Sequence, residues 1–211
     1  NGIDTPILIL GYTSPKEARK LAEWNLTQCA FDGEYLLELQ RALAPGQTLK
    51  VHLKIDTGMS RLGFYAHNDP SVKETAERIA AIIPQTPSLD YEGIFTHFTS
   101  SESDERKDTD EQFARFLQVL EELNKKKITF SLRHCANSGA TLQYPEMHLD
   151  MVRPGIILYG YAPDPAMGSY DLKPALELKA YVAQVHRLRK EDTVSYNRKK
   201  KKKKEMDIAT V

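Results

Sequence analysis

Short apolar runs alternate with amphipathic stretches along most of the chain. The apolar runs have the length of buried strands, and the stretches between them repeat apolar residues at helical spacing. We expect strands at residues 7–10, 27–31, 51–55, 93–98, 131–136 and 148–152, with a further apolar run at 156–159. We expect helices from residue 15 onward, at 33–43, 71–83 and 109–126, and directly after residue 137.

The residues at the helix starts support this assignment. Ser14 precedes Pro15, and proline is common at the first helical position, where its missing N–H costs nothing. Asp32 is the expected cap of the helix at 33–43, and Asp69-Pro70 opens the next helix. These helix starts separate the strands at regular intervals.

Repeated strand, helix, strand units predict a parallel α/β sheet. Six strands, with one end missing, fit a closed (β/α)₈ TIM barrel better than an open sheet, although periodicity by itself does not separate the two. After Gly160 the pattern changes, because Pro163, Pro165 and Gly168 interrupt the chain and residues 176–188 alternate as in β structure. We therefore expect a partial barrel over residues 1–165 and the start of a C-terminal β-rich domain over 172–211.

The bulk composition excludes several protein classes. Lysine plus arginine and aspartate plus glutamate each number 29, so the net charge is 0 and predicts no nucleic-acid partner. Two cysteines do not make a disulfide scaffold and favour a reducing compartment. No apolar run approaches the ~20 residues of a membrane span, and no signal peptide is visible. The chain begins with Asn1 and ends within an apparent strand, so we expect both ends to continue in a longer protein.

Polar residues recur where the expected strands end, which is where a barrel carries its chemistry. They are Arg61, His97, His134, Asn137, Ser138, Arg153 and Gly155. Each has a structural alternative: a salt bridge of Arg61 with Asp56, a core histidine, a helix cap or a turn glycine. Together they offer a phosphate site at a helix start, fixed arginine donors and a flat ring for stacking. These features suit pyridoxal phosphate but do not single it out.

The chain also resembles the alanine racemase family, the fold type III pyridoxal-phosphate enzymes, from the third barrel strand into the C-terminal domain. The matching segments are VHLKIDTGMSRLGF (51–64), GIFTHF (93–98), HCANSGATL (134–142), DMVRPGIILYG (150–160) and VSYN (194–197). The resemblance implies a racemase that interconverts L- and D-alanine by two-base α-proton transfer and supplies D-alanine for peptidoglycan. It also implies a pyridoxal 5'-phosphate cofactor, no metal, a bacterial cytoplasmic location, and a homodimer whose active site is shared across the interface.

Roles for individual residues follow from the resemblance. Arg61 would contact the phenolic oxygen of the cofactor and later the substrate, and Lys54, carbamylated in many members, would hold Arg61 in place. Met59 would line the substrate pocket. His97 would stack on the cofactor ring, and His134 would hydrogen-bond the arginine network beside the cofactor.

Arg153 would face the pyridine nitrogen. Because arginine does not readily give up a proton, the ring would stay unprotonated, which favours racemisation over transamination. The remaining implied cofactor contacts are Leu10, Asn137, Ser138, Gly155 and Ile156. Tyr196 would be a catalytic base acting on the partner's site, and its pKa, ordinarily about 10, would need a nearby positive charge to lower it.

The chain departs from the family pattern in two respects. The Schiff-base lysine is expected upstream of Asn1 and further substrate residues beyond Val211, so the chain by itself is expected to be inactive. Asn197 stands where the family usually has glycine, and the run 199–204 is all lysine, with poor β propensity. A nucleic-acid or membrane patch, a disordered loop and a poorly determined stretch of sequence are the alternatives for that run, and the last two weaken the role of Tyr196.

Other functions stay open at this point. One is a serine racemase of the same architecture, attached to a membrane through a fused domain, and others are lysine or broad-specificity racemases. A non-enzymatic pyridoxal-phosphate-binding barrel is disfavoured by the continuation over residues 176–196. A barrel decarboxylase for basic amino acids would lack the Arg153-Pro154-Gly155 arrangement.

Overall fold

The computed structural model describes residues 2, 4–103, 105–167, 170–194, 196, 200–201 and 204–211. These residues divide into two compact units, Asn1–Lys173 and Pro174–Val211, which are described separately.

The first unit contains a six-stranded sheet in the order β1-β2-β3-β5-β6, with β4 paired to β3 and every pair parallel. The strands are β1 (Ile7–Ile9), β2 (Leu26–Ala30), β3 (Leu49–Asp56), β4 (Phe64–Tyr65), β5 (Leu89–Phe95) and β6 (Leu132–His134). The helices are α1 (Ala18–Glu23), α2 (Gly33–Ala42), α3 (Asp69–Ile82), α4 (Lys107–Lys125) and α5 (Ser138–Gln143). Short 3₁₀-helices cover Pro15–Glu17, Ile83–Gln85, Pro145–Met147, Ile156–Tyr159 and Pro165–Met167.

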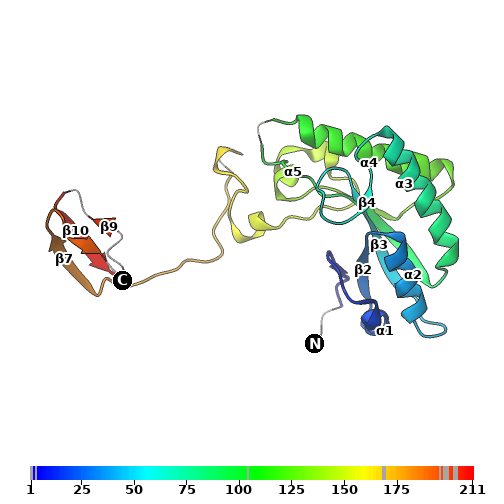
Figure 1. Ribbon diagram of the computed structural model, residues 1–211, viewed down its shortest axis with the longest axis horizontal. Helices are drawn as coiled ribbons and strands as arrows, with labels where there is room; N and C mark the ends of the chain where they lie inside the picture. Colours follow the sequence, from blue (N-terminus) through cyan, green and yellow to red (C-terminus); the bar gives the residue numbers. More distant parts are fainter. Residues whose placement is uncertain are drawn as a thin grey trace. The chain divides into compact units, whose positions relative to one another are not determined.

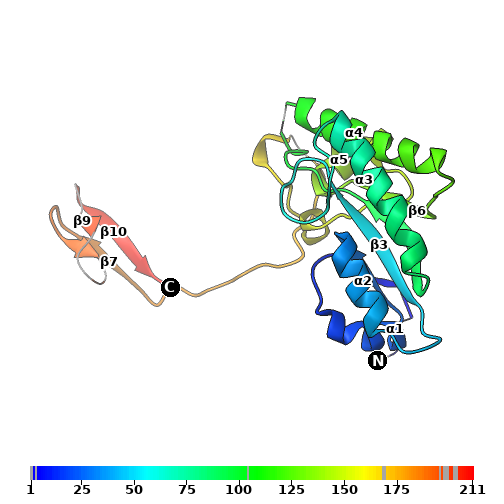
Figure 2. The same ribbon diagram turned by 45° about the vertical axis from the view of Figure 1, so that its right-hand side comes forward.

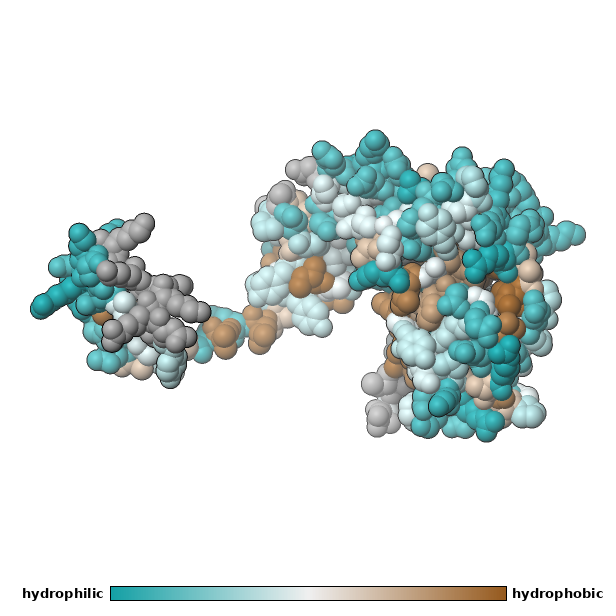
Figure 3. Space-filling model, in the orientation of Figure 1, coloured by the Kyte–Doolittle hydropathy of each residue, from teal (hydrophilic) through white to brown (hydrophobic). Residues whose placement is uncertain are grey.

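Figures 1 and 2 show α2, α3 and α4 side by side along one face of the curled sheet. Their buried apolar residues form one core with the sheet, and Figure 3 shows mainly hydrophilic residues on the outer surface over α3 and α4. A curled parallel sheet with helices on its outside is part of a TIM barrel. The predicted α/β class and partial barrel are therefore confirmed.

Strand β3 is buried on both of its faces. Val51, Leu53 and Ile55 join the core under the helices. His52 and Lys54 alternate with them, so they point to the barrel interior, where both are also buried. A strand buried on both faces is typical of a parallel sheet, and here its inner face carries polar groups.

The helix starts are partly as expected. Asp32 caps α2, with its Oδ1 accepting a hydrogen bond of 2.7 Å from the N–H of Tyr35. The cap of α3 is Asn68, one residue before the expected pair, and it exchanges hydrogen bonds with Ser71 in a capping box. Ser14 makes no side-chain cap bond; its carbonyl instead accepts from Glu17.

The strand expected at residues 148–152 is wrong. Leu149 turns the chain with a φ of 52°, and the N–H of Asp150 donates to the carbonyl of Arg133 at 3.1 Å. In return, the N–H of Arg133 donates to the carboxylate of Asp150 at 2.9 Å, where a strand would offer a carbonyl. The side chain therefore replaces the backbone ladder, although the N–H of Arg153 still bonds to Ala136 at 2.9 Å. The apolar run after it is the 3₁₀-helix Ile156–Tyr159.

The described residues of the second unit include two antiparallel strand pairs. Strand β7 (Gln184–Leu188) pairs with β10 (Met206–Thr210), and β8 (Thr193–Val194) pairs with β9 (Lys200–Lys201). Of the alternating stretch 176–188, only the last five residues form a strand. The domain boundaries at residues 165 and 172 stay a prediction.

Within the described part of the chain, no helix combines the length and apolar character that crossing a bilayer requires.

Candidate active site

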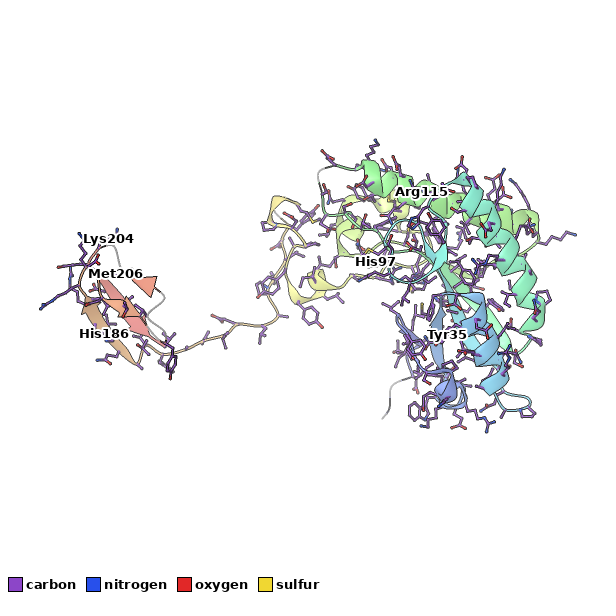
Figure 4. All side chains as sticks on the ribbon, viewed as in Figure 1. Tyr35, His97, Arg115, His186, Lys204 and Met206 are labelled. Carbon is purple, nitrogen blue, oxygen red and sulfur yellow. The ribbon has the colours of Figure 1, made fainter. Side chains whose placement is uncertain are left out.

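A pocket of about 420 Å³ lies at the carboxyl ends of the barrel strands. Seven of the eight predicted cofactor contacts line it, from loops that follow three different strands; they are Leu10, His97, Asn137, Ser138, Arg153, Gly155 and Ile156. Glu102, Gly139, Pro154 and Pro163 complete its wall. Figure 4 shows His97 among these loops of the first unit. The structure thus brings together residues up to 153 positions apart in the sequence, from Leu10 to Pro163.

A larger hollow of about 600 Å³ lies at the opposite end of β6. Its wall includes Arg133 and Asp150, but these two pair with each other at 2.7 Å and are thereby satisfied. The smaller pocket has converging polar groups and is the better candidate site.

One end of the smaller pocket is the start of α5. Asn137 caps this helix, because its Oδ1 accepts from the N–H of Ala140 at 3.1 Å and from Ser101 Oγ at 2.6 Å. Ser138 Oγ accepts from the N–H of Gly155 at 2.8 Å. Since a hydroxyl also donates, the Ser138 proton remains available to an anion in the pocket.

Arg153 is held by several contacts at once. Its Nη1 donates to His134 Nδ1 at 2.6 Å, and its Nη2 donates to the carbonyl of Thr96 at 2.8 Å. The guanidinium also lies 5.1 Å from the centre of the Phe95 ring. Burial lowers its pKa to about 10, so the group remains a cation at neutral pH.

His97 is a neutral ring at neutral pH. Burial, and then the positive charges of Arg153, Arg61 and Lys54, lower its pKa to about 4. Its Nδ1 lies 3.4 Å from Nη2 of Arg153. A neutral, flat imidazole in a pocket wall suits stacking against an aromatic ring.

The turn after β3 is organised by Asp56 and not by Arg61. The Asp56 carboxylate accepts from the N–H groups of Gly58 and Ser60, both at 3.0 Å, and lies 3.1 Å from His67 Nε2. Although burial alone would raise it, these hydrogen bonds hold the pKa of Asp56 below its ordinary value. Among the described residues Arg61 has no ion pair; its side chain is exposed and does not line the pocket.

Lys54 is buried beneath this turn, and Met59 is half-buried within it. Burial, and then the charges of Arg61 and Arg153, lower the pKa of Lys54. An unmodified, protonated Lys54 would therefore repel Arg61, the side chain that it is predicted to hold in place. Conversion of the lysine to an anionic carbamate would reverse that sign, and this modification stays a prediction.

Tyr196 belongs to the second unit, where its side chain is 93% exposed. Its predicted role in catalysis stays a prediction. Asn197 and three of the six lysines in the run 199–204, Lys199, Lys202 and Lys203, lie outside the described residues.

Comparison with known proteins identifies the family. Residues 1–163 match the family described as alanine racemase, N-terminal domain. The chain belongs to the alanine racemase family. The alanine racemase of Desulforamulus reducens is 40% identical over 213 residues, which cover 100% of this chain and 56% of that protein. The alanine racemase of Carboxydothermus hydrogenoformans is 43% identical over 198 residues, covering 92% and 52%.

Solved structures agree with this assignment. Alanine racemase from Bacillus anthracis with bound L-Ala-P has a TM-score of 0.84 at 31% identity, covering 99% of this chain and 53% of that one. A histidine racemase from Leuconostoc mesenteroides has a TM-score of 0.79 at 31% identity, covering 99% and 55%. The chain thus spans about half the length of the relatives it matches.

One residue of this alanine racemase family member that sequence reasoning missed is Gln112, on α4. Its Nε2 lies 3.3 Å from both Thr57 Oγ1 and the carbonyl of His97, and its Oε1 accepts from the N–H of Thr99 at 2.9 Å. One buried side chain therefore ties the turn that carries Arg61 to the loop that carries His97. The sequence feature that could have revealed Gln112 is its position one turn before Phe116, which places it on the buried face of α4.

A second group that sequence reasoning missed is His52 with Glu92. His52 Nδ1 lies 2.8 Å from His134 Nε2, deep inside the barrel. The signal was a polar residue at an inward position of β3, two residues before Lys54.

Proposed function

We propose that this chain is part of a pyridoxal-phosphate-dependent racemase that interconverts L- and D-alanine. The observation that carries the proposal is the pocket whose lining brings together the start of α5, the His97 ring and the fixed guanidinium of Arg153. Membership in the alanine racemase family supports the same reading.

The pocket residues offer hydrogen-bond donors and a flat ring of the kinds that the cofactor would use. The phosphate would lie at the start of α5, where the Ser138 hydroxyl and free backbone N–H groups are donors. The ring would lie against His97, and its nitrogen would accept a hydrogen bond from Arg153. Leu10 and Ile156 would add apolar contact on the remaining sides.

When bound, the cofactor supplies an electron-withdrawing ring that makes the α-proton of an amino acid more acidic. Arg153 limits this effect, because a guanidinium donates a hydrogen bond but does not protonate the ring nitrogen. The contacts of Arg153 to His134 and Thr96 keep it in that orientation. Arg61 and Met59 would contact the substrate, and Tyr196 would give or take the α-proton on one face.

The proposal includes a homodimer, since the family resemblance assigns Tyr196 to the partner's site, and a bacterial cytoplasmic location. It also includes D-alanine for peptidoglycan as the product's use. The histidine racemase is as similar in structure as several alanine racemases, so the substrate needs a direct test.

The test is an assay of the full-length protein with pyridoxal phosphate and each of L-alanine, L-serine and L-histidine, following the D-enantiomer by chiral chromatography. We expect the highest kcat/KM for alanine. Borohydride reduction followed by peptide mapping would locate the lysine that carries the cofactor. A cofactor that binds without racemising any of the three substrates would favour a non-enzymatic binding protein.

A further inference from the structure

Four polar side chains form a line through the barrel interior. His52 Nε2 lies 3.3 Å from Glu92 Oε2, and His52 Nδ1 lies 2.8 Å from His134 Nε2. His134 Nδ1 lies 2.6 Å from Arg153 Nη1. The chain runs from a half-buried carboxylate to the arginine of the pocket, and we call it the Glu92–Arg153 chain.

Only one arrangement of hydrogens satisfies all three contacts. A guanidinium can donate but not accept, so His134 Nδ1 must be the acceptor. The single hydrogen of a neutral imidazole then sits on His134 Nε2 and points at His52 Nδ1, which must also be bare. The hydrogen of His52 therefore sits on Nε2 and points at Glu92.

The same logic excludes a charged histidine in the chain. A proton added to His52 Nδ1 or to His134 Nδ1 would meet another N–H at hydrogen-bond distance. Burial, followed by the charge of Arg153, lowers the pKa of His134 to about 2. Burial also lowers the pKa of His52, although Glu92 opposes that change.

The rings of His52 and His134 are closely packed by their neighbours. A Cβ at Gly93 would lie 2.6 Å from His52 Cε1 and Nδ1, so only glycine leaves room for that ring. The Phe95 ring stacks on His134, with centroids 4.7 Å apart and an interplanar angle of 6°. At the outer end, Glu92 Oε1 lies 3.5 Å from Lys50, and Oε2 lies 3.4 Å from Thr27 Oγ1.

We propose that His52 and Glu92 are positioning residues that hold His134 in its Nε2–H tautomer, so that His134 presents a permanent acceptor to Arg153 and aims its guanidinium into the pocket. The direction of the hydrogen bonds along the Glu92–Arg153 chain follows from the geometry alone. Its consequence for the cofactor rests on the proposed function, in which Arg153 meets the ring nitrogen.

The first experiment reads the ring nitrogens directly. Long-range ¹⁵N–¹H spectra of the full-length protein, labelled at histidine, are recorded with and without pyridoxal phosphate. We expect His52 and His134 to be neutral and protonated at Nε2, with no titration between about pH 5 and pH 8. A hydrogen on Nδ1 of either ring, or a doubly protonated ring at neutral pH, would overturn the proposal.

The second experiment separates positioning from packing. His52→Asn places an amide oxygen near the position of Nδ1 and keeps an acceptor for His134, whereas His52→Leu removes the acceptor. We expect His52→Leu to weaken pyridoxal phosphate binding by about ten-fold or more and His52→Asn to restore most of it. Glu92→Gln, which keeps an acceptor for His52, should bind the cofactor within about three-fold of the parent.

Equal losses in His52→Asn and His52→Leu would indicate a packing role and overturn the proposal. If His52→Leu does not fold, the spectra of His52→Asn decide, because His134 must keep its Nε2 hydrogen. A protein that binds no pyridoxal phosphate would refute the proposed function, while the ring spectra would still test the chain itself.

Discussion

Gly93→Ala tests the packing that orients the Glu92–Arg153 chain. The added methyl carbon would lie 2.6 Å from two atoms of the His52 ring, whereas carbon atoms in contact prefer about 3.5–4.0 Å. The ring would have to move by about 1 Å. That displacement is enough to break the 2.8 Å hydrogen bond from His134 Nε2 to His52.

The expected cost follows from two contributions. A buried N–H left without an acceptor costs about 1–3 kcal/mol, and overpacking a close-packed interior costs about 1–3 kcal/mol more. We therefore expect Gly93→Ala to lower the free energy of unfolding by about 4 kcal/mol, measured by urea denaturation of the full-length protein. The matched control is Gly33→Ala, whose Cβ would meet Ile82 at an ordinary 3.8 Å and whose effect should stay within about 1 kcal/mol.

A double-mutant cycle assigns the effect to His52. In a His52→Ala background the ring is gone, so Gly93→Ala should cost less than about 1 kcal/mol, a coupling of about 3 kcal/mol. A coupling below about 0.5 kcal/mol would mean that the methyl group clashes with something other than His52. Gly93 would then not be the residue that leaves space for the His52 ring.

Four further outcomes are expected. His134 and His97 have pKa values of about 2 and 4 in the folded protein, below the ordinary ~6.5. Below about pH 6.5 the unfolded chain therefore binds more protons than the folded one, and the protein becomes less stable as the pH is lowered. The free energy of unfolding should drop by about 2 kcal/mol per histidine from pH 7 to pH 5, and equal urea midpoints at the two pH values would contradict this. Gln112→Met keeps the volume but removes the hydrogen bonds that tie two loops, and should destabilise by about 3 kcal/mol in urea titrations, whereas a loss below ~0.5 kcal/mol would show that the loops hold without it. Arg153→Glu should raise transamination relative to racemisation of alanine, and an unchanged ratio of the two products would argue against its role at the ring nitrogen. Tyr196→Phe should suppress racemisation much more than cofactor binding, and parallel losses would count against a catalytic role.

The sequence by itself determined the family and most of the helices and strands of the first unit. The alternation of β3 sends Val51, Leu53 and Ile55 to one face and His52 and Lys54 to the other, because successive side chains of a strand point to opposite sides. Asp32 and Asn137 cap helices where the pattern predicts them. Such signals are local, since a repeat period or a cap involves residues within a few positions of one another.

Only the tertiary structure decided which polar groups meet. His52 and His134 are 82 residues apart, and Gln112 reaches Thr57 across 55 residues. These contacts depend on the register of neighbouring strands and on the curl of the sheet, which no local pattern records. The side chain of Asp150 replaced a backbone ladder in the same way, and the neutral state of His134 arises from burial beside Arg153. The hydrogen-bond partners and charge states of these side chains are decided only in the folded protein, because both depend on which groups are buried away from water.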